Sequence, residues 1–362
     1  MPVSPDHQHA NGEIDIASLH AQDSTGLLAR IDRAVVWDIP LTTPFRGITR
    51  RDGVLLHGPG GWGEVAPFWD YGLEASAPWL ASGLCQALGN SLLPRYRETI
   101  SVNVTVPEIG AQDASDLVRA SGARTAKVKV SGSSDKRSED LERLEAVRSA
   151  LGRSGKVRID VNGAWDLDTA RENLPLMDRA AGGLEYAEQP CATVYDLADL
   201  RRAVDVPIAA DESIRLSANP LEIVHRRAAD VAILKVAPLG GVHRALDMAE
   251  RLGLPAVVSS ALDTSVGIMA GATLAFSLPS LSHACGLGTT YLLTQDVVDP
   301  SVRPSNGTLR LDAAAPVSER LLNEVKAGPY LTKHWQTRLL HLAGALHARR
   351  QREARDPSRA VA

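Results

Sequence analysis

The segment Ala126-Lys-Val-Lys-Val130 places two lysines two residues apart in an apolar run that is typical of a β-strand. Four later runs also carry an ionisable residue near their ends: Asp160 in Arg158-Ile-Asp-Val-Asn162, Glu188 in Glu185-Tyr-Ala-Glu-Gln-Pro190, Asp211 in Ala209-Ala-Asp-Glu-Ser213 and Lys235 in Ile233-Leu-Lys-Val236. Starting from Lys129, successive members of this series lie 31, 28, 23 and 24 residues apart. Each step is about one strand plus one helix, so the series predicts a (β/α) barrel whose strands deliver charge to one face.

Strand-like runs recur at this spacing through the middle of the chain. Eight segments have the pattern of strands: Ser101–Val106, Thr125–Val130, Val157–Asn162, Leu184–Gln189, Ile208–Glu212, Val231–Val236, Ala256–Ser260 and Ser282–Cys285. Several are nearly continuous apolar runs, as expected for parallel strands that are buried on both faces. A closed barrel needs eight strands. We therefore predict an α/β fold in which residues 101–298 form a modified (β/α) barrel.

The flanking segments predict a second, smaller unit. Residues 29–100 combine strand-like runs, a glycine-rich bend and a helical pattern, which indicates an α+β capping domain. Helical patterns within residues 299–350 are expected to return to this domain and complete it. The polar residues 1–28 and the charged residues 351–362 are predicted to be a disordered extension and a disordered tail.

The composition favours an enzyme that acts on a small molecule. Of the 362 residues 44% are hydrophobic, and a net charge of −4 gives no general electrostatic reason to bind nucleic acid or an anionic membrane. The sequence has neither a signal-peptide pattern nor an apolar stretch of about 20 residues. Its three cysteines are scattered and odd in number, which favours a reducing compartment. We expect a cytoplasmic protein, and the sequence specifies no oligomeric state.

Three carboxylates in the series predict a metal site. Asp160, Glu188 and Asp211 follow successive strands, and residues at the carboxyl ends of barrel strands converge on one face. Three hard oxygen ligands, with no Cys or His in the set, suit Mg²⁺, with Mn²⁺ as a possible substitute. A divalent ion there would bind a substrate carboxylate and stabilise the charge that forms when the neighbouring carbon loses its proton.

The lysines predict the base for that proton transfer. Lys127 and Lys129 point to the same side of their strand, into the barrel. A lysine acts as a base when nearby positive charge lowers its pKa, and here the metal and a second lysine supply that charge. Lys235 lies four strands further on and would approach from across the pocket. Asn162, two residues after Asp160, should face the same way and contact either the substrate or a metal ligand.

These charged positions resemble the enolase superfamily, in particular its muconate-lactonising-enzyme subgroup, over roughly residues 29–299. Within that subgroup four segments are similar to the o-succinylbenzoate synthase family: Thr43-Pro-Phe-Arg-Gly47, Gly61-Trp-Gly-Glu-Val-Ala-Pro-Phe68, Ser101-Val-Asn-Val-Thr-Val-Pro107 and Ala284-Cys-Gly-Leu-Gly-Thr289. The resemblance implies an Mg²⁺-dependent dehydratase of menaquinone biosynthesis with a small carboxylate substrate.

The resemblance also implies a role for individual residues. Lys129 would remove the proton alpha to the substrate carboxylate, Lys127 would tune Lys129, and Lys235 would stabilise the enediolate as a cation. The capping domain would close over the succinyl side of the substrate. Candidate substrate contacts are Arg46 in that domain and Ser259, Ser260 and Gly286 at the last two strand ends.

Other interpretations of the same residues stay open. Racemisation of N-acylamino acids or epimerisation of dipeptides would use Lys129 and Lys235 as opposed bases. A barrel that only binds metal and ligand, as a sensor, would not require a base. Glu212, adjacent to Asp211, is a weaker candidate for supporting the metal site. The segment Gly58-Pro-Gly-Gly-Trp-Gly63 matches a dinucleotide-binding motif, but the proline at position 67 disfavours the helix that this motif needs.

Overall fold

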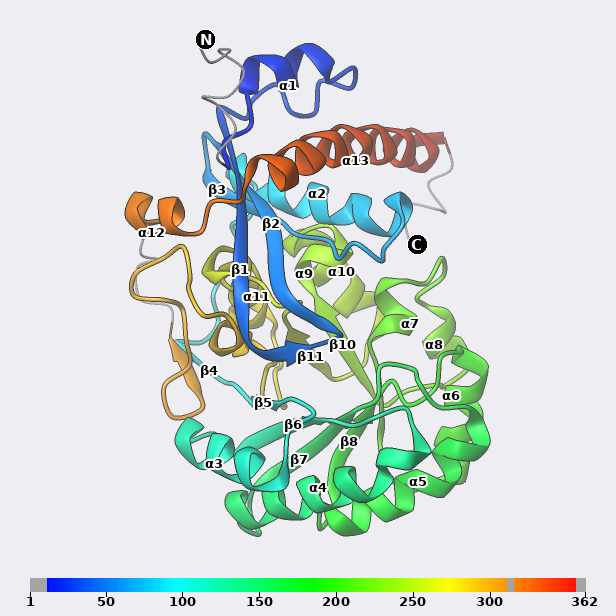
Figure 1. Cartoon of the computed structure of the whole chain (residues 1–362). Helices are drawn as coiled ribbons and strands as arrows, with labels where there is room; N and C mark the ends of the chain where they lie inside the picture. The colour runs from blue at the N-terminus through cyan, green and yellow to red at the C-terminus, as the bar shows by residue number, and fades with distance from the viewer. Residues whose placement is uncertain (1–11, 311–315, 356–362) are drawn as a thin grey trace.

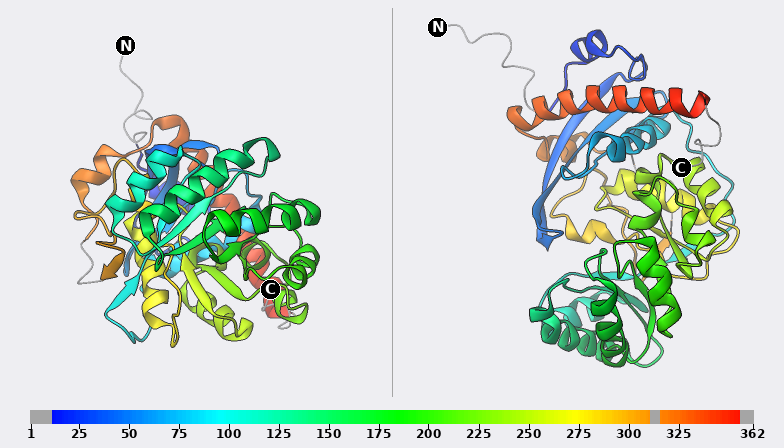
Figure 2. Two further views of the ribbon diagram at one scale, coloured as in Figure 1. Left: turned by 90° about the horizontal axis from the view of Figure 1, so that it is seen from below. Right: turned by 90° about the vertical axis from the view of Figure 1, so that its right-hand side faces the viewer.

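The structure, a computed structural model, describes residues 12–310 and 316–355 (Figure 1). A barrel fills the lower part of the view, and an antiparallel sheet with its own helices stands above it. The last helix, drawn in orange to red, crosses the upper part of the molecule in Figure 1 and in the right-hand view of Figure 2. The predicted fold class, a modified (β/α) barrel with an α+β capping domain, is confirmed.

Seven parallel strands form the barrel sheet, in the order β11-β10-β9-β8-β7-β6-β5. Their bounds are β5 Val104–Val106, β6 Thr125–Lys129, β7 Lys156–Asp160, β8 Leu184–Glu188, β9 Ile208–Ala210, β10 Val231–Lys235 and β11 Ala256–Ser259. Every residue of β6 is buried. Ala126 and Val128 belong to the main hydrophobic core. Since side chains alternate along a strand, the two lysines of β6 face the other way, into the barrel.

The eighth predicted strand, Ser282–Cys285, is reduced to a short bridge at its end. The N–H of Cys285 donates to the carbonyl of Ser101 at 2.7 Å, and the N–H of Gly286 donates to that of Val258 at 2.8 Å. Isolated parallel bridges join Cys285 and Gly286 to the two edges of the sheet. Two residues with hydrogen bonds on both sides therefore close the barrel.

The first predicted strand, Ser101–Val106, is divided in two. Only β5 joins the barrel, while β4 (Thr99–Ser101) pairs antiparallel with β12 (Thr308–Arg310). The division occurs where Val102 bridges Cys285, at the barrel seam.

Helices cover the outside of the barrel, and their ends follow local signals. Their bounds are α3 Ala111–Ser121, α4 Arg137–Leu151, α5 Leu167–Ala180, α6 Val194–Ala203, α7 Glu212–Arg215, α8 Glu222–His225, α9 Val236–Leu239, α10 Val242–Leu252 and α11 Ser265–Ser277. Asp166, Thr193 and Thr264 cap α5, α6 and α11 by accepting backbone N–H groups. Among the described residues, no helix has the length and apolar character needed to cross a membrane.

The capping domain is built on a three-stranded antiparallel sheet in the order β1-β2-β3. Its elements are α1 Ile16–Gln22, β1 Arg33–Phe45, β2 Ile48–Gly58, β3 Gly61–Val65, α2 Leu73–Ala87, α12 Glu319–Glu324 and α13 Pro329–Arg355. Trp335 of α13 is fully buried in the capping core and donates its indole N–H to Asp52 at 2.7 Å. The chain therefore returns from the barrel to complete the smaller domain.

The segment Gly58–Gly63 forms the turn between β2 and β3 and the start of β3. A Cβ atom at Gly63 would lie 2.0 Å from the carbonyl oxygen of Gly83 in α2, and one at Gly60 would lie 2.0 Å from the backbone of Gly89. The glycines thus allow α2 and the residues after it to pack directly on the hairpin. This packing accounts for the glycine-rich pattern without a nucleotide.

Two segments that the sequence placed in disordered ends are ordered where the structure describes them. Residues 12–28 include α1, whose Leu19 is fully buried in the capping core together with Leu28. At the other end α13 extends through Arg355, so residues 351–355 are helical. Residues 1–11 and 356–362, which belong to the same two predictions, lie outside the described residues.

Leu19→Ala is expected to destabilise the protein by about 3 kcal/mol, because it removes a fully buried side chain from a packed core. The exposed Gln22 on the same helix is the matched control, and Gln22→Ala should change the free energy of unfolding by less than about 0.5 kcal/mol. Urea unfolding of both variants measures the difference. Equal, small effects would mean that α1 does not pack on the capping domain.

Candidate active site

Strand register brings the predicted charged residues to one level at the carboxyl ends of the barrel strands. Lys129 of β6 pairs with Asp160 of β7, and Asp160 pairs with Glu188 of β8. Asp211 directly follows β9, and Lys235 is the last residue of β10. Because β7, β8 and β9 separate β6 from β10, Lys129 and Lys235 face each other across the barrel mouth.

Short ion pairs connect these side chains. Lys127 Nζ lies between Asp160 Oδ2 at 2.9 Å and Glu188 Oε1 at 2.8 Å. Lys129 Nζ donates to Asp160 Oδ2 at 2.6 Å. Lys235 Nζ donates to Asp211 Oδ2 at 2.6 Å, and all of these groups are buried. The structure therefore brings together the three lysines and three carboxylates that the sequence singled out.

The two lysines of β6 differ in their electrostatics. Burial opposes the charge of Lys127, but Asp160 and Glu188 outweigh burial and hold its pKa well above the usual value. Burial also lowers the pKa of Lys129, and the positive charge of Lys127 lowers it further. Asp160 raises the pKa of Lys129, but not enough to reverse these two effects. Lys127 is thus the permanent cation, and Lys129 is the lysine that loses its proton more easily.

The three carboxylates also differ from one another. Burial, with the nearby charge of Asp160, raises the pKa of Glu188 to about 7. Burial acts on Asp160 in the same direction, but Lys127 and Lys129 reverse it and hold its pKa well below the usual range. Likewise, burial of Asp211 is overcome by Arg215 and Lys235, which lower its pKa.

The donor set fits a hard divalent cation. Among the residues that the structure describes, no three His, Cys, Asp or Glu side chains are arranged closely enough to form a ready metal cage. The lysine ammonium groups instead lie against the carboxylates. Glu188 Oε2 is nevertheless buried without a hydrogen-bond partner in the described part of the chain, which is a costly state for a carboxylate oxygen unless a cation binds it. This oxygen, with Asp160 and Asp211 beside it, is consistent with a metal site.

A small cavity above these groups has walls from both domains. Its lining comprises Phe45, Arg46, Phe68, Tyr71, Trp79, Thr105, Lys127, Lys129, Asp160, Asn162, Arg215, Lys235, Ser259, Ser260, Ala261, Leu262 and Thr289. The guanidinium of Arg46 lies 4.3 Å from the centre of the Phe68 ring. Ser260 Oγ and Thr289 Oγ1 are 2.7 Å apart. Four of the five predicted substrate contacts, Arg46, Asn162, Ser259 and Ser260, therefore line this cavity.

Gly286 is not part of that lining. A Cβ atom at this position would lie 2.4 Å from Ser259 Oγ and 3.2 Å from its Cβ, so the barrel seam approaches β11 closely at this glycine. Its carbonyl accepts a hydrogen bond from Ser260 Oγ at 2.8 Å. The structure thus gives Gly286 a role in barrel closure and in orienting Ser260.

Comparison with known proteins agrees with this geometry. Residues 110–316 match the family described as enolase C-terminal domain-like, and residues 36–87 match the enolase N-terminal domain-like family. The o-succinylbenzoate synthase of Thermobifida fusca (strain YX) is 52% identical over 83% of this chain and 93% of its own length. The chain belongs to the o-succinylbenzoate synthase family of the enolase superfamily. The synthase of Mycobacterium tuberculosis (strain H37Rv) is 46% identical over 86% of this chain and 94% of its own.

Solved structures show that this synthase family member has the superfamily fold. The L-Ala-D/L-Glu epimerase from Bacillus subtilis has a TM-score of 0.66 at 25% identity, over 80% of this chain and 98% of its own. Muconate lactonizing enzyme from Pseudomonas fluorescens has a TM-score of 0.68 at 22% identity, over 81% and 98% of the two chains. N-succinyl Arg/Lys racemase from Bacillus cereus has a TM-score of 0.70 at 21% identity, over 81% and 96%.

The stability of the metal-free protein is expected to fall as the pH rises, because of the carboxyl group of Glu188. The folded protein keeps this carboxyl protonated up to about pH 7, whereas the unfolded chain releases the proton near 4.5. In that window the folded state binds more protons, so the contribution of Glu188 to stability falls as pH rises. The glutamine of Glu188→Gln does not titrate. Relative to that variant, the free energy of unfolding of the wild type should fall by about 1 to 3 kcal/mol between pH 4.5 and 7.5. Urea unfolding with chelator measures this loss, and parallel pH profiles would contradict it.

Three residues that orient the site were not predicted from the sequence. Gln189 is fully buried, and its Oε1 accepts the backbone N–H of Asp211 at 3.0 Å. Arg215 donates to Asp211 Oδ1 at 2.9 Å. Tyr71 reaches the site from the capping domain and accepts a hydrogen bond from Arg215 at 2.7 Å. Only Arg215 carried a detectable signal, because a cation four residues after Asp211 pairs with it on a helix.

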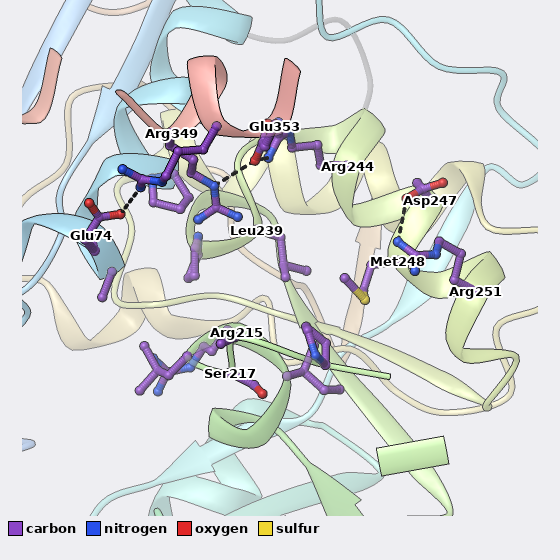
Figure 3. A pocket seen from close by; sticks show the side chains of 18 residues that line it. Glu74, Arg215, Ser217, Leu239, Arg244, Asp247, Met248, Arg251, Arg349 and Glu353 are labelled. Atoms are coloured by element: carbon purple, nitrogen blue, oxygen red, sulfur yellow. Dashed lines mark hydrogen bonds and ion pairs between the residues drawn. The ribbon is translucent and has the colours of Figure 1, made fainter. Parts of the chain in front are cut away.

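A second cavity, the outer cavity, lies outside the catalytic cluster. Its volume is about 540 Å³. It lies between the capping helices α2 and α13 and the barrel helices α7, α9 and α10, and Figure 3 shows the side chains that line it. Arg244 and Glu353 form an ion pair across it. None of the three lysines and three carboxylates lines this cavity, but Arg215 lines both cavities.

Proposed function

We propose that this chain catalyses, in the cytoplasm, the reaction of its synthase relatives. In that reaction a cyclohexadiene carboxylate loses water to give o-succinylbenzoate for menaquinone biosynthesis. The enzyme would act as a carbon–oxygen lyase. Identities of 46–52% over most of the chain support the assignment, and so does the presence of the complete charged series at the barrel mouth.

The observation that carries the mechanism is the asymmetry of the two lysines on β6. Lys129 has a lowered pKa and lines the substrate cavity, so it takes the proton from the carbon next to the substrate carboxylate. Lys127 stays charged between Asp160 and Glu188 and maintains the positive field that favours the neutral, proton-accepting form of Lys129. Loss of hydroxide from the adjacent carbon then completes the elimination of water.

Lys235 faces the reacting carbon from the opposite side of the barrel. Its ammonium is held by Asp211 at 2.6 Å and lines the cavity floor. Negative charge develops on the substrate carboxylate as the proton leaves, and a fixed cation in a buried site stabilises that charge. Lys235 would therefore act as an electrostatic partner and not as a second base.

Asp160, Glu188 and Asp211 would hold Mg²⁺, with Mn²⁺ as a substitute. The free Oε2 of Glu188 and the all-oxygen donor set support this choice. The bound ion would bring positive charge to the substrate carboxylate and so make the neighbouring proton more acidic. Chelation is expected to abolish turnover, and Mg²⁺ is expected to restore it.

The capping domain would bind the succinyl arm of the substrate. Arg46 lies on the cavity wall beside Phe68 and Tyr71, where its guanidinium is available to a second carboxylate. Ser259 and Ser260 border the same cavity from β11 and the residue after it. These contacts would place the ring between the two lysines.

Steady-state turnover of the cyclohexadiene precursor, measured beside racemisation of an N-succinylamino acid, tests the assignment. Racemisation is the second candidate because Lys129 and Lys235 face each other and could serve as two bases. The proposal predicts fast, Mg²⁺-dependent dehydration. If racemisation alone is observed, the racemase assignment replaces the dehydratase assignment. If the protein binds metal and substrate but turns over neither substrate, a sensor role replaces it.

A further inference from the structure

We propose that Arg215 is a positioning residue that couples closure of the capping domain, sensed through Tyr71, to the orientation of both Lys129 and Lys235. This inference rests on the proposed function and assigns a role to a residue outside the charged series. Arg215 ends the short helix α7, and its side chain is only 2% exposed.

Arg215 has three partners, one of them in the other domain. It donates to Asp211 Oδ1 at 2.9 Å, to Glu212 Oε1 at 2.7 Å and to the hydroxyl of Tyr71 at 2.7 Å. A guanidinium presents several N–H donors in one rigid plane, so each partner constrains the direction of the others. Tyr71 lies in the loop between β3 and α2, which belongs to the capping domain.

The first route from Arg215 leads to Lys235. The two oxygens of Asp211 are divided between them, since Oδ1 accepts from Arg215 and Oδ2 accepts from Lys235 at 2.6 Å. Rotation of the Asp211 carboxylate would move both donors together. Arg215 therefore fixes which oxygen faces Lys235.

The second route leads to Lys129 through two side chains. Glu212 Oε1 accepts from Arg215 and also from Asn162 Nδ2 at 3.1 Å. Asn162 Oδ1 in turn accepts from Lys129 Nζ at 2.5 Å. Since an amide donates through its nitrogen and accepts through its oxygen, the contact with Glu212 fixes the Asn162 oxygen toward Lys129.

On the capping side the Tyr71 hydroxyl also accepts a hydrogen bond from Arg46 Nη1 at 3.2 Å. Arg46 lies over the rings of Phe68 and Tyr71. One phenol oxygen therefore joins a proposed substrate contact of the capping domain to the arginine that orients the lysines. The Tyr71 hydroxyl is the third partner of Arg215, so the capping loop is linked to both routes.

A double-mutant cycle tests this coupling. We expect Tyr71→Phe and Arg215→Lys each to lower kcat about 10- to 100-fold, with KM changing less than about threefold, and the double variant to be no slower than Arg215→Lys alone. Arg244→Lys, on the wall of the outer cavity, is the matched control and should keep wild-type kcat. Effects that multiply in the double variant, or a rise in KM without loss of kcat, would overturn the proposal.

Amide hydrogen exchange separates this inference from the proposed function, because it requires no turnover. Tyr71→Phe, a change in the capping domain, is expected to speed exchange at residues 161–164 of the barrel, and no further increase is expected in the Arg215→Lys background. Unchanged exchange there would refute the coupling even if the wild type proves to be an active synthase. Accelerated exchange would support the coupling even if the wild type has another activity.

Chemical rescue distinguishes positioning from a general structural role. Arg215 is among the residues that line the outer cavity (Figure 3), so a small cation in that cavity is expected to reach the place of the removed guanidinium. In Arg215→Ala, guanidinium at tens of millimolar is expected to restore kcat at least tenfold, and methylammonium, which lacks the planar fork, is expected to restore little. Equal rescue by both ions, or none in a folded variant, would overturn the proposal.

Discussion

Lys129→Met is expected to lower kcat for the dehydration by at least about 1,000-fold, because the variant keeps the length of the side chain but has no group to accept the α-proton. The substituted nitrogen lies 2.6 Å from Asp160 and borders the substrate cavity. Steady-state kinetics with saturating Mg²⁺ measures the loss. Retention of more than a tenth of wild-type kcat would exclude Lys129 as the base.

Lys127→Met is the matched comparison for this prediction. It removes the other lysine of the strand and leaves Asp160 and Glu188 without their shared cation. We expect a smaller loss of kcat than in Lys129→Met. The pH optimum should also shift to higher pH, because the pKa of Lys129 rises when the neighbouring charge is removed. The melting temperature of each variant shows whether it is folded.

Glu188→Gln is expected to weaken Mg²⁺ binding by at least about 100-fold, since even residues that merely support a metal ligand contribute 10- to 100-fold. The amide keeps the size of the side chain and removes the charge at the buried oxygen that has no protein partner. Titration calorimetry or the Mg²⁺ dependence of activity gives the affinity. The loss of activity should be partly recovered at high Mg²⁺ concentration.

Thermal unfolding supplies a control that is independent of activity. Mg²⁺ should raise the melting temperature of the wild type, because a ligand that binds only the folded state stabilises it. The same concentration should have little effect on Glu188→Gln. Equal stabilisation of the two proteins by Mg²⁺ would place the metal elsewhere.

The barrel was predictable because its signals are local and repeat. Lys129, Asp160 and Glu188 each end a buried strand, and the spacing between them reflects one strand and one helix. The eighth strand was predicted to be longer than it is. Closure of the barrel depends on backbone hydrogen bonds of only two residues, which leave little pattern in the sequence. Strand β3 was overlooked because its glycines, which α2 packs against, look like those of a bend.

The ordered part of the N-terminal segment was missed for a related reason. Polar and apolar residues are mixed in residues 12–28, and the order of α1 depends on the burial of Leu19 and Leu28 against a domain that is completed more than 300 residues later. Composition alone predicts that such a segment is disordered. The contact that orders it is tertiary.

In the site, sequence predicted the residues that carry charge at strand ends but not those that orient them. Asp211 stood out because it follows a strand, whereas Gln189 and Tyr71 act through hydrogen bonds to it or to its partner. Gly286 was predicted to contact substrate, yet its neighbours show a packing constraint. Such roles depend on which backbones approach each other in space.

Turnover of the cyclohexadiene precursor by the purified protein tests the central claim most directly, with Mg²⁺, with chelator, and with an N-succinylamino acid assayed on the same preparation. We predict rapid dehydration to o-succinylbenzoate that chelator abolishes and Mg²⁺ restores. Racemisation without dehydration, or dehydration that persists in chelator, would contradict the assignment of a metal-dependent o-succinylbenzoate synthase.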